Sequence, residues 1–423
     1  MKLFSSISHI RFRFCLLVLL LGFLGGLPLS GNAKTNGFTF ADPRAKSVRI
    51  PIEIQHNVVL LPLRINGSFE MTFILDTGVK TTILTETVLL NFLSLDTLQP
   101  VRLRGLGEGD FIEGMLARNV SMRLPGVVGA GINMVVLPED LISYSELFGR
   151  SVHGIIGYEI FGQFVVEINY QHKYLVLHDP FQYKPPRNKR RYETLPITIK
   201  RFKPFVQAKL EDGAGNIIDR EWLIDTGASH SISLYDPNLP LPDPSIDAFL
   251  GMGLSGNVYG KIGRAPRFYM GQFQFDDIIA GYPKPEALYI PEEDLLKWYG
   301  NIGSEVISRF NVVFDYAHNR LILRKNASYK EPFFYNVSGL EIMTEGAGFD
   351  DFVISYVRPN SPAEKAGIKI DDEIIALNGI SVTGLGISDI YQSLRKRAGK
   401  RVSLRIRRGD QMMKVRFAID AQI

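Results

Sequence analysis

Short apolar runs separated by turn residues predict a β-hairpin in the first part of the chain. Residues 58–65 and 68–75 are two such runs, with Asn66-Gly67 between them, and the second run ends at Asp76. An Asn-Gly pair between apolar runs is typical of a tight hairpin turn, because both turn positions need positive φ. The expected hairpin therefore delivers Asp76 at the end of a strand.

The same pattern occurs a second time. Residues 205–210 and 217–224 are apolar runs on either side of a polar, glycine-rich turn at 212–216. Both predicted hairpins lead directly into the tripeptide Asp-Thr-Gly, at residues 76–78 and 225–227. An internal repeat of this kind indicates a duplicated structural unit.

A later segment of each unit is also repeated. Residues 154–170 resemble residues 300–316 at a constant offset of 146. The interval from Asp76 to Gly157 is 157 − 76 = 81, and the interval from Asp225 to Gly303 is 303 − 225 = 78. We expect two similar β lobes, at 48–180 and 192–328. The identical pairs at this offset are Glu159/Glu305, Phe164/Phe310, Tyr170/Tyr316 and His172/His318.

Between the lobes, residues 184–191 are rich in proline and positive charge. Such a composition is typical of a solvated connector, and a phosphate-binding patch is the alternative.

The character of the sequence changes after about residue 330. Residues 361–368 predict a short capped helix, 371–379 a strand entering a turn, 388–398 an amphipathic helix and 401–407 a strand. A third, α+β module is therefore expected at 335–420.

The N-terminus has the pattern of a secretory signal. Three basic residues precede an apolar run at 14–29, and small residues follow at 31–33. The run of 16 residues is shorter than the roughly 20 that span a bilayer. We expect cleavage of residues 1–33 and no stable membrane span afterwards; an uncleaved anchor is the alternative.

Removal of the signal changes the charge and the cysteine content. The basic residues fall from 48 to 45 against 44 acidic ones, so the mature chain is near +1, which does not favour nucleic acid as a partner. The single cysteine, Cys15, lies in the signal. A disulfide-free exported protein suits a bacterial periplasm or cell surface, and a thiol nucleophile is excluded.

Two Asp-Thr-Gly loops in matched contexts point to paired carboxylates. Two carboxyl groups about 3 Å apart share one proton, so that one can take a proton from water while the other donates to a carbonyl. The threonine hydroxyls can bond the opposing loop, and the glycines permit close approach. The histidines show no metal-ligand spacing, and we expect no metal and no cofactor.

These motifs resemble the retropepsin-like aspartic proteases, in particular bacterial exported members with two fused lobes and a C-terminal PDZ domain. The resemblance covers about residues 48–328 for the protease and 335–420 for the PDZ part. It implies a mostly β fold, with two pepsin/retropepsin-like β lobes in tandem followed by a PDZ-like α+β module. The residues that it implies for the site are the catalytic pair Asp76 and Asp225 and the supporting Thr77, Gly78, Thr226 and Gly227.

The chain departs from this family pattern near both aspartates. Val79-Lys80 follow the first tripeptide where small residues are usual, and an ammonium close to the dyad would lower carboxyl pKa values. Lys80 lines the substrate cleft instead if it points outward. The resemblance implies that the segments 155–157 and 301–303 brace the catalytic loops. In the second segment, Asn301 stands where an apolar residue is usual.

The resemblance also places glycine-rich flaps about 30 residues after each catalytic loop, at 104–110 and 251–256. The second segment spells G-x-G-x-x-G, but no helix pattern follows, so a hairpin tip is favoured over a dinucleotide site. The expected substrate-binding residues are Gly107, Gly109, Gly253 and Gly256.

In the C-terminal module, the stretch Gly339, Leu340, Glu341 and Ile342 resembles the carboxylate-binding loop of a PDZ domain. Such domains add a peptide to a sheet edge and bind its C-terminal carboxylate. The alternative is a module that only docks against the lobes.

Together these features predict an exported aspartic endopeptidase that acts on protein or peptide substrates and binds peptide C-termini through its PDZ domain. A catalytically silent peptide-binding or scaffold protein is the alternative, which the position of Lys80 keeps open.

Overall fold

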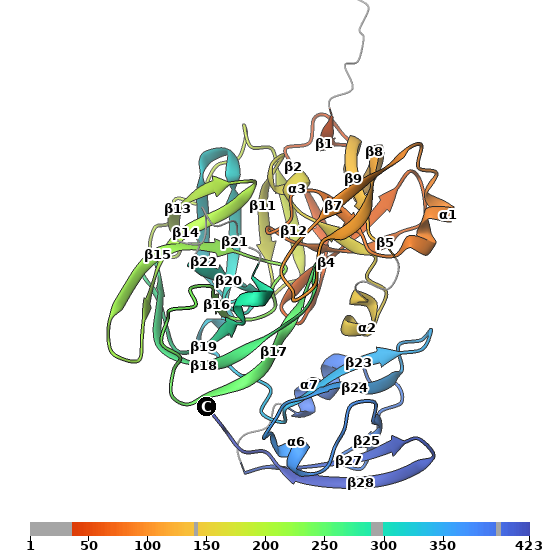
Figure 1. Ribbon diagram of the computed structural model, residues 1–423. Coiled ribbons are helices and arrows are strands. Elements are labelled where there is room, and N and C mark those ends of the chain that lie inside the picture. Colours follow the sequence, from red (N-terminus) through yellow and green to blue (C-terminus); the bar gives the residue numbers. More distant parts are fainter. Residues whose placement is uncertain (1–35, 139–142, 289–298, 395–398) are drawn as a thin grey trace, which may run out of the picture. The chain divides into compact units, whose positions relative to one another are not determined.

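The computed structural model describes residues 36–138, 143–288, 299–394 and 399–423. The predicted signal at 1–33 lies outside these residues. Strands dominate the described chain (Figure 1), which confirms the predicted mostly β fold class. The helices are short, and none that the structure describes is long and apolar enough to cross a bilayer.

The first lobe is built on a nine-stranded sheet. Its central hairpin joins β4 (Val58–Ile65) to β5 (Met71–Leu75), with Asn66 at φ 48° and Gly67 at φ 75°, as predicted for this turn. The other elements are β1 (Gly37–Phe40), β3 (Glu53–Gln55), β6 (Thr82–Leu84), β7 (Leu98–Leu103), β8 (Ile112–Leu124), β9 (Val127–Val136), β10 (Gly154–Ile156), η1 (Thr87–Leu89), α1 (Leu90–Leu93), α2 (Tyr144–Phe148) and α3 (Tyr158–Phe161).

The second lobe repeats this construction. Its hairpin joins β14 (Lys203–Glu211) to β15 (Ile217–Ile224), as predicted. The other elements are β13 (Glu193–Lys200), β16 (Ile232–Leu234), β17 (Ser245–Gly253), β18 (Gly256–Met270), β19 (Phe273–Pro283), η2 (Pro285–Ala287), β20 (Gly300–Ile302) and α5 (Ser304–Ile307). The connector at 184–191 is largely exposed and has no helix or strand.

The strands around the two tripeptides have the same topology in both lobes. Strand β10 runs parallel to β5 and antiparallel to β6. Strand β20 runs parallel to β15 and antiparallel to β16. The repeated sequence therefore builds a repeated strand arrangement, and it places both Asp-Thr-Gly loops at equivalent strand ends.

A sheet shared by the two lobes holds them together. Its strands include β2 (Ser47–Pro51), β11 (Val165–Asn169), β12 (Tyr174–His178), β21 (Phe310–Asp315) and β22 (Arg320–Lys325), and the short helix η3 (Tyr316–His318) connects β21 to β22. Strand β11 pairs with β21, and Glu167 lies opposite Val313. Because 313 − 167 is the repeat offset of 146, a pseudo-two-fold axis passes through this pair.

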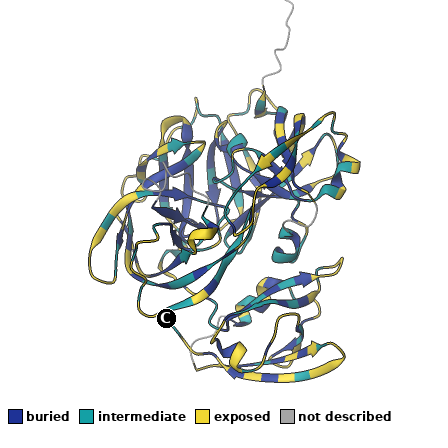
Figure 2. Cartoon of the chain, in the orientation of Figure 1, coloured by how far each residue is buried: buried dark blue, intermediate teal, exposed yellow. Residues whose placement is uncertain are grey.

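The core is continuous across the lobes, and buried residues fill the sheets in Figure 2. Trp222 is fully buried in the second lobe. Phe161 of the first lobe stacks on Tyr316 at a ring separation of 5.5 Å. Burial of such large apolar side chains is the main favourable contribution to folding in a chain without disulfides.

The C-terminal module has a six-stranded sheet and its own core. Ser361 caps the predicted short helix by accepting a hydrogen bond from Glu364 N at 3.1 Å. The predicted helix at 388–398 is described as far as Leu394. The elements are η4 (Ala327–Lys330), which precedes the module, and β23 (Leu340–Glu345), β24 (Asp351–Val357), α6 (Pro362–Lys365), β25 (Glu373–Leu377), β26 (Ile380–Ser381), α7 (Ile387–Leu394), β27 (Arg401–Arg408) and β28 (Gln411–Ala418).

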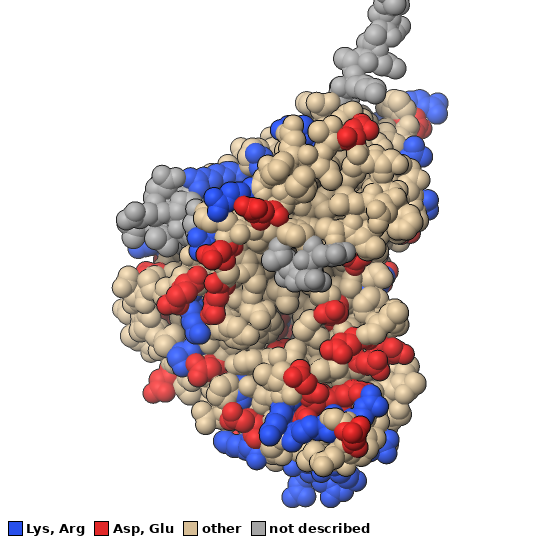
Figure 3. Space-filling model, turned by 45° about the vertical axis from the view of Figure 1, so that its right-hand side comes forward, with Lys and Arg blue, Asp and Glu red and all other residues tan. Residues whose placement is uncertain are grey.

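Acidic and basic side chains are intermixed on the face of the molecule drawn in Figure 3, most densely over the C-terminal module. In the C-terminal module, Arg407 pairs with Glu373, and Arg408 pairs with Asp372. Paired charges of both signs agree with the near-neutral balance of the sequence.

Candidate active site

Two buried strands deliver Asp76 and Asp225 to one place. Each aspartate directly follows its strand, β5 or β15. The backbone N–H of Asp76 donates to the carbonyl oxygen of Ile156 at 2.9 Å, and that of Asp225 donates to the carbonyl oxygen of Ile302 at 3.0 Å. The ends of β10 and β20 thus brace the two loops, in the positions predicted for these segments.

The two threonines link the loops across the pseudo-two-fold axis. Thr77 Oγ1 accepts from Thr226 N, and Thr226 Oγ1 accepts from Thr77 N, both at 3.0 Å. The same hydroxyls donate to carbonyl oxygens of the opposite strand, Thr77 to Ile224 at 2.6 Å and Thr226 to Leu75 at 3.0 Å. Both side chains are buried, so this network fixes the separation of the loops.

The two glycines allow the carboxyl groups to approach each other. A Cβ at Gly227 would lie 2.4 Å from Cγ of Asp76. A Cβ at Gly78 would lie 3.0 Å from Oδ1 of Asp76 and 3.4 Å from Oδ1 of Asp225. Only glycine leaves room here, and the pair forms a compact dyad.

The dyad holds a proton at neutral pH. The pKa of Asp76 is raised to about 8, first by burial and then by the charge of Asp225, against a lowering by the hydrogen bond from Gly78 N. Two carboxyl groups this close cannot both ionise easily. A pair with one protonated and one ionised carboxyl group can donate a proton to a carbonyl oxygen and accept a proton from a water molecule in the same step.

Lys80 is not the cation that lowers the pKa of Asp76, although its position in the sequence suggested this effect. Its side chain is exposed, and its Nζ lies 4.2 Å from the ring centroid of Phe202. The cation whose charge lowers the pKa of Asp76 is Lys203, at the start of β14. Lys203 is 127 residues from Asp76 (203 − 76), and nothing in the sequence near it pointed to this role.

Asn301 contacts the dyad directly. Its Nδ2 donates to Oδ2 of Asp225 at 3.1 Å, and its Oδ1 lies 2.8 Å from Nε2 of His230. The sequence marked Asn301 only as a departure in a bracing segment. The structure brings Asn301 and His230 to one side of the dyad.

Tyr144 of α2 is a further residue that the sequence did not single out. Burial raises the pKa of its phenol, and the charges of Asp76 and Asp225 raise it further. It packs against the apolar cluster that includes Ile74 and Ile155 beside the catalytic loops. An aromatic side chain therefore lies within the electrostatic reach of both carboxyl groups.

The repeated glutamates also support the loops. Glu159 Oε1 accepts from Thr82 N at 2.7 Å, and Glu305 Oε2 accepts from the Ser231 hydroxyl at 2.5 Å. Each glutamate thus fixes the chain that leaves its catalytic loop, which explains why an acidic residue recurs at both positions of the repeat.

The predicted flaps are hairpin tips that contact each other. The loop at 104–111 joins β7 to β8, and Leu254 and Ser255 join β17 to β18, so the G-x-G-x-x-G segment opens no helix. Gly109 N donates to the carbonyl oxygen of Ser255 at 2.8 Å, and Ser255 N donates to that of Leu106 at 2.9 Å. Met252 and Leu254 pack against the apolar cluster beside the dyad.

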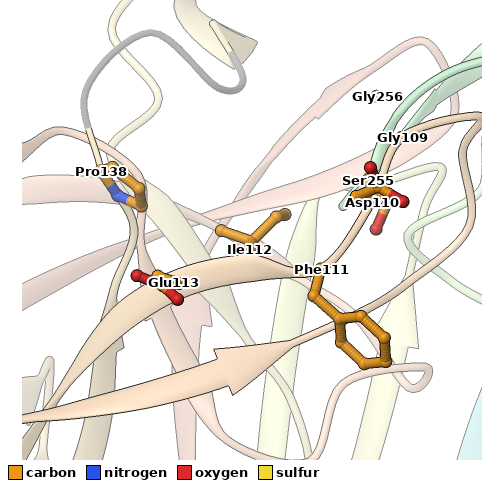
Figure 4. A pocket seen from close by; sticks show the side chains of 8 residues that line it. All are labelled: Gly109, Asp110, Phe111, Ile112, Glu113, Pro138, Ser255 and Gly256. Carbon is orange, nitrogen blue, oxygen red and sulfur yellow. The ribbon is translucent and has the colours of Figure 1, made fainter.

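The flap glycines lie at these contacts. A Cβ on Gly107, at φ 130°, would lie 2.4 Å from the backbone of Ser255, and one on Gly253 would lie 2.2 Å from the carbonyl oxygen of Leu106. A pocket of about 330 Å³ opens beside them (Figure 4). Its lining residues are Gly109, Asp110, Phe111, Ile112, Glu113, Pro138, Ser255 and Gly256.

Comparison with known proteins identifies two domains in the chain. Residues 61–160 match the family model described as aspartyl protease, and residues 353–408 match the model described as PDZ domain. The chain contains an aspartyl protease domain and a PDZ domain. The protease match lies within the first lobe, from β4 to α3, and includes Asp76.

Curated relatives share shorter stretches. The chain is 37% identical over 84 residues to the carboxy-terminal processing protease CtpB of Bacillus subtilis, and 33% identical over 81 residues to CtpA of the same organism. It is 36% identical over 66 residues to the chloroplastic C-terminal processing peptidase of Tetradesmus obliquus. These stretches cover 16–19% of this chain and 14–18% of the relatives.

The predicted peptide-binding loop of the PDZ domain leads into β23, an edge strand that pairs with β24. On its other side, Ile342 N donates to the hydroxyl of Tyr391 from α7 at 2.9 Å, and that hydroxyl donates to the carboxylate of Glu341 at 3.0 Å. Leu340 N donates to the Ser338 hydroxyl at 3.3 Å. The backbone N–H groups of Leu340 and Ile342 thus donate to side chains of the domain itself.

Strand β23 also contacts α2 of the first lobe. The Thr344 hydroxyl donates to the carbonyl oxygen of Glu146 at 2.9 Å, and His56 lies edge-on to Tyr391 at a ring separation of 5.6 Å. The same edge that would receive a peptide is therefore in contact with the protease part.

No cluster of three or more histidine, cysteine or acidic side chains suited to a metal ion occurs within residues 36–138, 143–288, 299–394 and 399–423.

Proposed function

We propose that the chain is an aspartic endopeptidase that hydrolyses peptide bonds with a water molecule held between Asp76 and Asp225. The observation that carries the proposal is the close, half-buried pair of carboxyl groups on two symmetry-related loops, which the buried Thr77 and Thr226 tie together. The family match of the first lobe supports a protease, and the geometry supports the aspartic mechanism.

In this mechanism the ionised carboxylate takes a proton from the water while the oxygen of that water forms a bond to the scissile carbonyl carbon. The electron pair of the carbonyl π bond moves to its oxygen, which takes the proton of the other carboxyl group. The resulting gem-diol then collapses. The carboxyl group protonated by the water gives its proton to the leaving nitrogen as the C–N bond breaks, and the other carboxylate takes a hydroxyl proton from the gem-diol as the C=O bond reforms. No cofactor enters any of these steps.

The flaps would cover the substrate in this scheme. Their tips, with Gly107, Gly109, Gly253 and Gly256, hydrogen-bond to each other, and the adjoining side chains Met252 and Leu254 reach the apolar cluster beside the dyad. A flap closed over a peptide excludes water and strengthens the electrostatic interactions inside.

The proposal extends to location and recruitment. A cleaved signal at 1–33 would export the enzyme to a bacterial periplasm or cell surface, and the PDZ domain would bind peptide or substrate C-termini through Gly339, Leu340, Glu341 and Ile342. The relatives that share stretches with this chain are named carboxy-terminal processing proteases, which supports a role in proteolysis. The scaffold alternative depended on an ammonium group close to the dyad. The Lys80 ammonium lies over the ring of Phe202, so the enzyme is the favoured proposal.

The experiment is cleavage of a peptide library by the purified protein from acid to neutral pH, with Asp76→Asn and Asp225→Asn beside it. We expect cleavage by the unmodified protein and loss of cleavage in both variants. Cell fractionation and N-terminal sequencing test the export part separately: a mature N-terminus at Lys34 in a soluble periplasmic or external fraction supports it, and retention of residues 1–33 contradicts it.

A further inference from the structure

The surroundings of the two catalytic carboxyl groups differ although the lobes repeat each other. At the offset of 146, the residue equivalent to Asn301 is Ile155 (301 − 146). His230 is five residues after Asp225, and the residue five after Asp76 is Thr81. The second lobe therefore places an amide and an imidazole where the first lobe has an aliphatic chain and a hydroxyl.

Asn301 is held rigidly against Asp225. Its backbone lies in β20, between Leu223 on the parallel side and Ser233 on the antiparallel side, and only 1% of the residue is exposed. A carboxylate oxygen can only accept, so the amide group of Asn301 must direct its Nδ2 hydrogens to Asp225. Its Oδ1 then faces Nε2 of His230, which donates to it.

The two carboxyl groups consequently accept different numbers of hydrogen bonds from N–H groups of the described residues. Asp225 accepts three: Gly227 N at 3.1 Å and Ala228 N at 3.2 Å on Oδ1, and the Asn301 amide at 3.1 Å on Oδ2. Asp76 accepts one, from Gly78 N at 2.6 Å on Oδ1. N–H donors stabilise the ionised form of a carboxyl group, so the larger set favours the charge on Asp225.

We propose that Asn301, oriented by His230, is a positioning residue that makes Asp225 the ionised base and leaves the shared proton of the dyad on Asp76. This inference rests on the proposed function and adds to it an assignment of roles. Asp225 then takes the proton of the attacking water, and Asp76 donates to the carbonyl oxygen of the substrate.

The direction of the shift at Asp76 agrees with this assignment, since burial and the charge of Asp225 raise its pKa to about 8. The other titratable or charged groups that act on the dyad come from several elements. They are Tyr144 of α2, Lys203 of β14, Tyr235 after β16 and Tyr316 of η3. Next to His230, the backbone N–H of Glu305 in α5 donates to the carbonyl oxygen of His230 at 3.2 Å. Replacement of Asn301 leaves all of these groups in the protein.

The test uses Asn301→Leu, which keeps the approximate size and removes the amide, and His230→Ala, which removes the group that orients it. Asn188→Leu in the exposed connector is the matched control for an Asn-to-Leu change. Carboxyl carbon NMR signals of Asp76 and Asp225 in the full chain, assigned from Asp76→Asn and Asp225→Asn, are followed from pH 3 to pH 10. Cleavage rates are measured over the same range.

We expect the unmodified protein and the control to ionise Asp225 well before Asp76. In Asn301→Leu the first ionisation step should move up by about one pH unit, the acid limb of kcat/KM should move with it, and kcat should fall about tenfold. The shift in His230→Ala should have the same direction and be smaller. A purely structural role would lower thermal stability without moving either limb.

The inference is overturned if both variants, folded by circular dichroism, keep the order of ionisation and the acid limb of the unmodified protein. Should Asn301→Leu not fold, His230→Ala decides alone. A folded protein that cleaves no peptide contradicts the proposed function, and the NMR titration still decides whether Asn301 sets the order of ionisation.

Discussion

Thr77 and Thr226 each accept a hydrogen bond from the backbone N–H of the other at 3.0 Å, although 149 residues separate them. Their hydroxyls also donate to Ile224 and Leu75, so four buried hydrogen bonds join the two catalytic loops. This network sets the distance between the carboxyl groups, and the chemistry of the dyad depends on it.

Replacement of Thr226 by valine should therefore affect both stability and activity. The variant leaves Thr77 N and the carbonyl oxygen of Leu75 buried without a partner, which costs about 1–3 kcal/mol for each unsatisfied group. Urea unfolding should show this loss, and cleavage should fall at least tenfold. Thr226→Ser retains the hydroxyl and should stay close to the unmodified protein; equal losses in the serine variant would contradict the argument.

Stability should depend on pH through Asp76. Its pKa is raised to about 8 in the folded protein from 3.8, so between these values the folded state holds a proton that the unfolded state has released. Folding stability from this group therefore falls as pH rises from about 4 to about 8. Asp76→Asn should remove that decline, so the free energy of unfolding of the variant should increasingly exceed that of the unmodified protein across this window.

The same shift predicts the alkaline limit of activity. Above about pH 8 the dyad loses its shared proton, so cleavage should decline there. Urea unfolding at several pH values measures the stability effect, and a pH–rate profile measures the activity effect. A difference between Asp76→Asn and the unmodified protein that stays constant from pH 4 to pH 8 would show that the proton is not held in the folded state.

Lys203 and Lys80 should behave differently when replaced. The charge of Lys203 lowers the pKa of Asp76, whereas the Lys80 ammonium is exposed and lies over Phe202. Lys203→Met should move the alkaline limb of the pH–rate profile to higher pH, and Lys80→Met should leave it in place. The opposite pattern would mean that Lys80 reaches the dyad in solution.

Closure of the flaps should depend on Gly107. A methyl group there would meet the backbone of Ser255 at 2.4 Å, and φ of 130° is strained for any other residue. Gly107→Ala should separate the flap tips and raise KM severalfold in peptide cleavage. Gly213→Ala, at a turn with no atom within 4 Å of the added Cβ, is the control and should leave KM unchanged. An unchanged KM for Gly107→Ala would argue against a role of the tip in substrate binding.

The PDZ loop should bind peptides more tightly once Tyr391 loses its hydroxyl. Ile342 N now donates to that hydroxyl, and a peptide carboxylate or strand must replace it. In Tyr391→Phe, affinity of the full chain for a fluorescent C-terminal peptide library should rise severalfold by anisotropy. Weaker binding would show instead that the hydroxyl takes part in recognition.

Local patterns of the sequence were enough to predict the hairpins that carry the dyad. The Asn66-Gly67 turn needs positive φ at both positions and shows it, and the strand ends at Leu75 and Ile224 lie where the apolar runs end. The capping of α6 by Ser361 was equally visible, because it depends on residues three apart. Signals of this kind are local and survive in any tertiary context.

Contacts between distant residues could not be predicted in this way. The pairing of Glu167 with Val313 depends on the register between strands of different lobes, which no local pattern records. Asn301 reaches Asp225 across 76 residues, and its apolar surroundings in the sequence suggested only a bracing role. The electrostatic effects of Lys203 and Tyr144 likewise follow from the packing of whole elements around the loops.

Cleavage of a peptide library by the purified protein, compared with Asp76→Asn and Asp225→Asn, tests the central claim most directly. The account predicts that the protein cleaves and that each single replacement abolishes cleavage while the fold is retained. Cleavage that survives in either variant, or a folded protein that cleaves no peptide between acid and neutral pH, would contradict a shared catalytic dyad.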